Sequence, residues 1–171
     1  MQNVSRLAAI LAASLLCTSS VQASEWQTIS GENPAGKKFV SMNIQQDKFV
    51  LEFHCDESDW QDNRLGVKFF GPPVPNLDEE DGATAKLSFL FSRRDGVLYR
   101  EAWEPYYFNG GPGDQAWLGT INAGKSELDA LAAALKLDIL NVDAELLYSF
   151  ETVGTAAGVR AIREVCKLGL E

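Results

Sequence analysis

An alternation of apolar and polar residues with a period of two runs through the middle of the chain, and it restricts the fold more than any other feature. The alternating runs are residues 47–55, 65–69, 86–91 and 97–103, and residues 37–44 are predicted to pair with the first of them. Successive side chains of a β-strand point to opposite faces, so each run predicts a strand with one face on a core. Arg94-Asp95-Gly96 joins the last two runs and predicts a tight hairpin, because aspartate and glycine tolerate the positive φ that such turns need.

The last third of the chain changes to a helical period. Apolar residues recur at helical spacing from Leu128 to Leu135, with Ser126 as the predicted N-cap. A second helix is predicted to begin at Thr155 and to carry Cys166 on its buried face.

Strands are also predicted at residues 137–142 and 145–152, whereas residues 56–63, 71–84 and 104–118 show no regular pattern. The predicted fold class is therefore α+β, with an antiparallel β-sheet or sandwich of about seven or eight strands, two helices in the C-terminal third and one disulfide.

Residues 1–23 have the pattern of a secretory signal peptide. Arg6 precedes an apolar run, Leu7–Leu16, and Val21-Gln22-Ala23 forms a small-residue cleavage motif. The run is too short to span a membrane. The sequence predicts cleavage between Ala23 and Ser24, a single globular domain over residues 24–171, and a periplasmic or secreted protein.

Cleavage leaves two cysteines, Cys55 and Cys166. Two cysteines in an exported domain usually pair. The alternative, a free and reactive thiol pair, lacks the C-x-x-C spacing of redox motifs. We therefore expect a structural disulfide that closes most of the chain into one loop.

The chain is acidic, with 24 Asp and Glu against 15 Lys and Arg and a formal net charge of −9. Such a charge is repelled by nucleic acids and by anionic membrane surfaces, so neither a nucleic-acid partner nor membrane insertion is expected. A protein partner is expected instead, and the charge favours a basic one. The alternative is that the charge serves solubility alone.

Motifs for catalysis are missing from the sequence. His54 is the single histidine, it adjoins Cys55 on a predicted strand, and no G-x-S-x-G motif accompanies it. One histidine with carboxylates is a poor zinc ligand set. No catalytic residue, no metal ligand and no cofactor is therefore predicted, and His54 is interpreted as a solvent-side strand residue.

Acidic residues gather in two predicted loops, at 56–62 and 78–81. Neither run matches the calcium loop D-x-[DN]-x-[DN]-G-x₅-E, so solvated loops are favoured, and calcium binding stays an open alternative. A glycosidase needs two carboxylates that face each other across a cleft, which a single sequence does not reveal.

Aromatic residues supply the candidate binding surface. Trp103, Tyr106, Tyr107, Phe108 and Trp117 lie on either side of the glycine-rich stretch Asn109–Asp114. Trp60, in the acidic loop between Asp59 and Asp62, is a second candidate of the same kind. Aromatic side chains beside a loop are typical of protein interfaces. The alternative is that Trp103 and Trp117 end strands and pack on the core, with the tyrosines covering the rim.

Near the C-terminus, Phe150-Glu151-Thr152-Val153-Gly154 is followed by Ala161-Ile162 and then Cys166, which reads F-x-x-x-G…A-I-x-x-x-C. This motif resembles the ending of small, uncharacterised exported bacterial proteins of the invasion-associated or secretion-accessory type. The resemblance covers the C-terminal third only. It implies a strand that runs into a final helix whose cysteine joins an earlier strand, and it implies no catalytic residues.

Together these features predict a non-enzymatic binding or accessory protein of the periplasm or extracellular space. Its most specific form is an inhibitor of a basic partner that acts on the cell envelope. An envelope hydrolase with paired carboxylates and a carrier of a small apolar ligand are the alternatives. The sequence leaves the oligomeric state open.

Overall fold

The computed structural model describes residues 25–59 and 62–170. The predicted signal peptide, its cleavage site and Trp60 lie outside these residues. Within them the chain forms ten strands and two helices. In chain order these are β1 (Gln27–Glu32), β2 (Lys38–Gln46), β3 (Phe49–Asp56), β4 (Arg64–Phe70), β5 (Leu87–Arg93), β6 (Gly96–Trp103), β7 (Tyr106–Asn109), β8 (Gln115–Asn122), α1 (Lys125–Ala133), β9 (Lys136–Leu140), β10 (Leu146–Glu151) and α2 (Thr155–Cys166).

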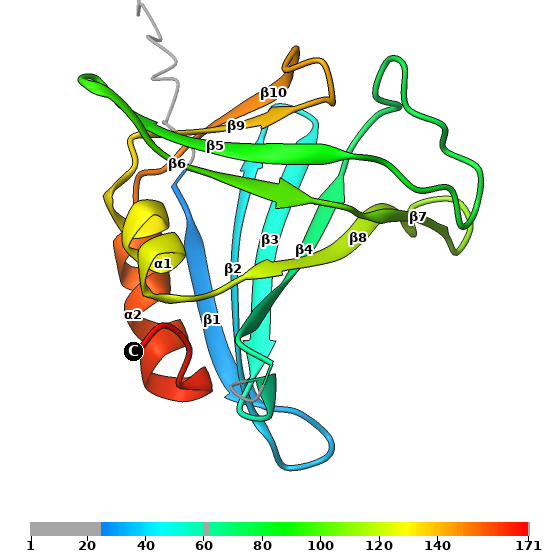
Figure 1. The fold of residues 1–171 in the computed structure, drawn as a ribbon. Helices are drawn as coiled ribbons and strands as arrows, with labels where there is room; N and C mark the ends of the chain where they lie inside the picture. Colours follow the sequence, from blue (N-terminus) through cyan, green and yellow to red (C-terminus); the bar gives the residue numbers. More distant parts are fainter. Residues whose placement is uncertain (1–24, 60–61, 171) are drawn as a thin grey trace, which may run out of the picture.

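The strands form two antiparallel sheets (Figure 1). Sheet A has six strands in the order β1-β2-β3-β4-β8-β7, and sheet B has four in the order β10-β9-β5-β6. Helix α1 follows β8 and helix α2 follows β10, so both lie late in the chain. The predicted α+β class with antiparallel sheets is confirmed.

Three strands lie where the sequence shows no clear alternation. All six residues of β1 are exposed, so neither of its faces produces a period-two signal. Strand β7 has only four residues, and with the start of β8 it falls in the stretch 104–118 that the sequence leaves irregular. The structure therefore has more strands than the sequence predicts.

The core lies between the inner faces of the two sheets. Phe53 from β3 meets Phe89 from β5 edge to face, with their ring centroids 5.8 Å apart. Trp103 from β6 stacks on Phe89 with the centroids 5.0 Å apart. All three side chains are fully buried. The alternating apolar residues of the predicted strands supply this core.

Helix α2 begins at Thr155, as predicted, and packs over β2. A Cβ at Gly158 would lie 2.8 Å from the Met42 sulfur, so glycine allows the helix to approach the sheet closely. Helix α1 begins earlier than predicted. Its N-cap is Gly124, which makes no side-chain capping bond, and the predicted cap at Ser126 is wrong.

The predicted disulfide is confirmed. Cys55 at the end of β3 joins Cys166 at the end of α2 across a sequence separation of 111, with the two Cα atoms 6.2 Å apart. An intramolecular disulfide of this kind is typical of proteins in oxidising compartments. Within the described ranges, neither helix has the length and hydrophobicity needed to cross a membrane.

Candidate functional site

The face of sheet A that points away from the core, here the outer face, carries the side chains that alternate with the core residues. Strand register arranges them in rows. His54 on β3 lies opposite Gly66 on β4, and Gly66 lies opposite Thr120 on β8. Farther along the same face, β7 places Tyr106 and Phe108 beside β8. The outer face therefore has a polar end and an aromatic end.

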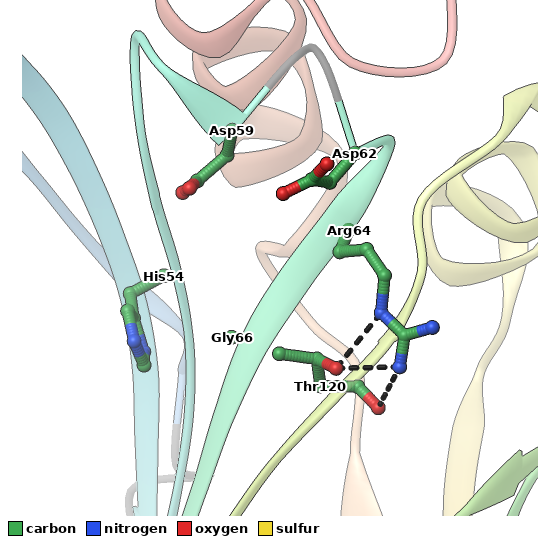
Figure 2. Close-up of a pocket in the computed structure, with 6 residues that line it drawn as sticks. All are labelled: His54, Asp59, Asp62, Arg64, Gly66 and Thr120. Carbon is green, nitrogen blue, oxygen red and sulfur yellow. Dashed lines mark hydrogen bonds between the residues drawn. The ribbon is translucent and has the colours of Figure 1, made fainter.

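A hollow of about 490 Å³ opens at the polar end, next to the turn that follows β3 (Figure 2). Strands β3, β4 and β8 form its floor, and the acidic turn forms one wall. The lining residues are His54, Asp59, Asp62, Arg64, Gly66 and Thr120. We call this feature the acidic hollow.

Arg64 is tied to β8 at the side of the hollow. Its Nε donates to Thr120 Oγ1 at 2.8 Å, and its Nη2 donates to Thr120 Oγ1 at 2.5 Å and to the Thr120 carbonyl at 3.3 Å (Figure 2). In the part of the chain that the structure describes, Arg64 forms no ion pair with Asp59 or Asp62. Arg64 therefore does not neutralise the carboxylates of Asp59 and Asp62 by direct pairing.

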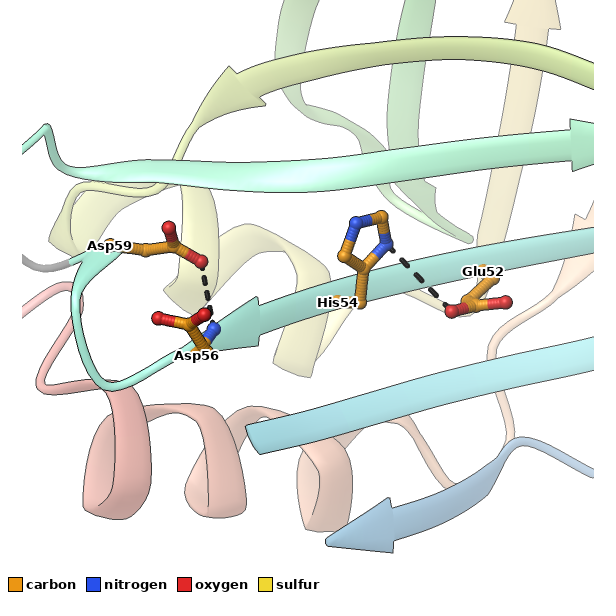
Figure 3. Close-up of polar contacts among 4 residues, drawn as sticks. All are labelled: Glu52, His54, Asp56 and Asp59. Carbon is orange, nitrogen blue, oxygen red and sulfur yellow. Dashed lines mark hydrogen bonds and ion pairs between the residues drawn. The ribbon is translucent and has the colours of Figure 1, made fainter. Parts of the chain in front are cut away.

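The ring of His54 lies over Gly66. A Cβ at position 66 would lie only 2.4 Å from His54 Nε2, so the ring can keep this position only above a glycine. On the other side of the ring, Nδ1 lies 3.7 Å from Glu52 Oε1 (Figure 3). That separation is too long for a hydrogen bond, and Nδ1 has no hydrogen-bond partner among the described residues.

Burial lowers the pKa of His54 below the ordinary value of 6.5, and the nearby Lys68 ammonium lowers it further. The carboxylates of Glu52 and Asp59 act in the opposite direction but do not outweigh burial. The imidazole is therefore neutral at neutral pH. It adds a hydrogen-bonding group to the acidic hollow without adding positive charge.

We expect Gly66→Ala to raise the pKa of His54 toward 6.5, because the new methyl group pushes the half-buried ring farther into solvent. An NMR titration measures this directly, since the chain has a single histidine. In the wild type, the stability that His54 contributes is complete above pH 6.5 and is lost as pH falls through the lower pKa of the folded state, because the unfolded state binds the proton first. As pH falls below 6.5, the Gly66→Ala variant should lose less stability than the wild type. An unchanged His54 pKa in the variant would contradict the packing of the ring on Gly66.

The wall of the acidic hollow is ordered by its own carboxylates. Asp59 Oδ2 accepts the backbone N–H of Asp56 at 2.7 Å (Figure 3). Asp56 Oδ1 accepts the backbone N–H of Ser58 at 2.7 Å and also accepts its hydroxyl, and these bonds lower the pKa of Asp56. The turn therefore fixes the Asp59 carboxylate at the wall of the hollow, and the Asp56 carboxylate is held within the same turn.

The second acidic run, at residues 78–81, does not contribute to this site. Glu79 Oε1 accepts the backbone N–H of Val74 at 2.9 Å, and Asp81 Oδ1 accepts that of Asn109 at 2.9 Å. Its side chains thus close their own loop and join it to β7. Within residues 25–59 and 62–170, no three His, Cys, Asp or Glu side chains gather closely enough to hold a metal ion.

The aromatic candidates divide between surface and core. Tyr106 and Phe108 are 48% and 39% exposed on the outer face. Trp103 and Trp117 are buried and pack on the core, as the alternative interpretation has it, whereas Tyr107 is buried beside Trp117 instead of covering the rim. Trp60 lies outside the described residues. The aromatic surface that the structure shows therefore consists of Tyr106 and Phe108.

The acidic hollow thus combines carboxylates, a neutral imidazole and a tethered guanidinium. The gap between His54 and Glu52 gives no oriented acid–base pair. Carboxylates beside a concave surface, with exposed aromatic rings on the same face, suit the binding of a cationic group on a larger partner.

Protein-family models, curated proteins and solved structures were compared with the chain, and none matches it. The function is therefore inferred from the geometry of the site.

Sequence reasoning did not single out Arg64, Gly66 or Thr120. Local signals exist for Gly66 and Arg64 only. Gly66 interrupts the polar positions of an alternating run, which indicates the close approach of another group. Arg64 is the polar residue at the start of the same strand. Thr120 has no local signal, because its role depends on the pairing of β8 with β4.

Proposed function

We propose that the protein is an exported, non-enzymatic accessory protein that binds a basic macromolecular partner through the outer face of sheet A. The observation that carries this proposal is the presence, on one sheet face, of the acidic hollow and of the exposed rings of Tyr106 and Phe108. A small-molecule site would enclose its ligand more fully, whereas this face is broad and open.

Charge defines the partner. The chain has a formal net charge of −9, and Asp59 and Asp62 concentrate negative potential at the polar end of the face. A basic protein would be steered toward this end, and its Lys or Arg side chains would enter the acidic hollow. Tyr106 and Phe108 would then add apolar contact at the other end. The most specific form of the proposal is an inhibitor of a basic, envelope-active hydrolase of the lysozyme type.

The proposed location is the periplasm or the extracellular space. The Cys55–Cys166 disulfide supports an oxidising compartment. The signal-peptide pattern of residues 1–23 supports export. The C-terminal resemblance to exported bacterial accessory proteins agrees with this location and is part of the same proposal.

Binding to a purified basic lysozyme tests the proposal, with a basic protein of similar size that has no hydrolase activity as the comparison. We expect the association rate with lysozyme to fall about tenfold or more when salt is raised from about 0.02 to about 0.5 M, because screening removes the steering. The dissociation rate should change much less. Lysozyme activity, followed by the clearing of a cell-wall suspension, shows whether binding also inhibits.

Matched variants locate the surface. Asp59→Asn with Asp62→Asn should slow association, since asparagine keeps the hydrogen-bond acceptor and removes the charge. Asp95→Asn with Asp143→Asn removes the same charge from exposed residues elsewhere and should have a smaller effect. Equal effects of the two pairs would show that only net charge matters and would overturn the assignment of the hollow. Failure of both basic proteins to bind would overturn the proposed partner class.

A further inference from the structure

Strand β1 ends sheet A with an open edge. Within residues 25–59 and 62–170 it pairs with β2 on one side only (Figure 1). All six of its residues are exposed. Among the described residues, no segment other than β2 forms backbone hydrogen bonds with β1. Alternate residues of an edge strand turn their N–H and C=O groups outward, so β1 presents a row of unpaired donors and acceptors.

Two other sheet edges are closed by specific contacts. At β7, the N–H of Tyr107 donates to the Ala83 carbonyl at 2.7 Å, and the N–H of Gly82 donates to the Tyr107 carbonyl at 2.8 Å. At β10, the Gln46 side chain takes the place of a strand. Its Nε2 donates to the Ser149 carbonyl at 2.8 Å, and its Oε1 accepts the backbone N–H of Glu151 at 3.1 Å.

The sequence of β1 lacks the residues that usually keep an edge from pairing. Its sequence, Gln27-Thr28-Ile29-Ser30-Gly31-Glu32, contains no proline and no lysine, and its single charge is at its end. A hollow of about 400 Å³ also opens at this edge. The residues around it are Ser30, Gly31, Glu32, Lys38, Phe39 and Val165. The edge therefore has both backbone groups to pair and space for the side chains of an added strand.

The edge strand β1 is complementary to a second copy of itself, because it carries an exposed apolar side chain at Ile29 and no side chain at Gly31. Ile29 is 54% exposed and points to the same face as Gly31, two residues away. Gly31 has no side chain and lies against the ring of Phe39, which pairs with it from β2. An antiparallel copy of β1 centred on Ser30 would place Ile29 of each copy opposite Gly31 of the other. Each Ile29 would then reach the ring of Phe39 in the other copy.

From this arrangement we propose that two copies of the chain pair antiparallel through β1, about a two-fold axis at Ser30, and join their two sheets A into one. In this register Glu32 lies opposite Thr28 of the second copy, so the two like charges do not face each other. A second copy fits better than a strand from another protein. Each β1 supplies both the exposed Ile29 side chain and the Gly31 position that accepts Ile29 from the other copy. The proposal does not depend on the proposed binding of a basic partner.

Sedimentation equilibrium of the oxidised protein tests the pairing. Because a single strand edge is a small interface, we expect a reversible dimer with a dissociation constant between about 1 µM and about 1 mM. Added salt should tighten it by screening the repulsion between two chains of net charge −9. Ile29→Lys should weaken the dimer at least about tenfold, because the symmetry places the substitution in the interface twice.

Val142→Lys is the matched control, since Val142 is also exposed but lies in the turn after β9. It should leave the dimer unchanged. A protein that stays monomeric up to millimolar concentration would overturn the proposal, and so would a dimer that Ile29→Lys leaves intact.

Cross-linking tests the register itself. Residues directly opposite in an antiparallel pair have Cα atoms about 4.5–5.5 Å apart, which a disulfide can bridge. Ser30→Cys should therefore form a dimer linked through Cys at position 30 under mild oxidation. Gln27→Cys should not, because in this register position 27 does not face itself. Equal cross-linking of the two variants would contradict pairing about Ser30.

Discussion

Replacing Cys55 and Cys166 together by alanine should lower the free energy of unfolding by about 2–4 kcal/mol. The bond joins residues 111 apart, so it removes many conformations from the unfolded chain. The chain-entropy model gives about 4–5 kcal/mol for a loop of this size, and measured losses are usually smaller. Urea unfolding followed by far-UV circular dichroism, in buffers that differ only in the presence of a reductant, measures the difference.

The reduced wild type is the control for this variant. It keeps both sulfur atoms in the core, where Cys55 and Cys166 are buried, so it loses the cross-link without leaving a cavity. The double alanine variant should therefore be somewhat less stable than the reduced wild type. A double variant that unfolds at the same urea concentration as the oxidised wild type would contradict a stabilising role for the bond.

The sequence predicts the strands in which apolar and polar residues alternate because one face is buried and the other is exposed. Strands β3, β5 and β6 have one face on the core, so their alternation is visible without a structure. Strand β1 has no buried face, and β7 is too short to show a period. The disulfide was predictable for a different reason: the signal-peptide pattern predicts an exported domain with two cysteines, and two cysteines in such a domain usually pair.

The candidate site was less predictable, because it depends on register. The sequence places His54 on the polar side of a strand, but it does not show that Gly66 lies beneath the ring. That contact needs the pairing of β3 with β4, and Thr120 enters only through the pairing of β4 with β8. Long-range pairing of this kind leaves no local pattern in a single sequence.

The aromatic cluster shows the same limit within a few residues. Tyr106, Tyr107 and Phe108 look equivalent in the sequence, yet alternation along β7 sends the middle residue to the core and its neighbours to the surface. Their different burial predicts different consequences for substitution, and the contrast is largest between Trp103 and Phe108.

Trp103→Ala should lower the free energy of unfolding by about 3–5 kcal/mol, because Trp103 is fully buried and stacks on Phe89. Phe108→Ala should cost less than about 1 kcal/mol, since 39% of this residue is exposed on the outer face. Chemical unfolding followed by far-UV circular dichroism compares the two. Trp103→Phe keeps most of the buried ring, so its loss in the free energy of unfolding should lie between those of the two alanine variants. It provides a measurable variant if Trp103→Ala does not fold.

The same pair of variants separates the structural from the functional role of the aromatic residues. If Phe108 contributes to binding, Phe108→Ala should raise the dissociation rate of a bound basic lysozyme while leaving the unfolding transition in place. Trp103→Phe should change stability and leave that rate near the wild-type value, because the indole of Trp103 does not reach the outer face. A Phe108→Ala protein that is as unstable as Trp103→Ala would show that β7 is held by this ring, and the outer face would then lose its aromatic end as a separate binding element.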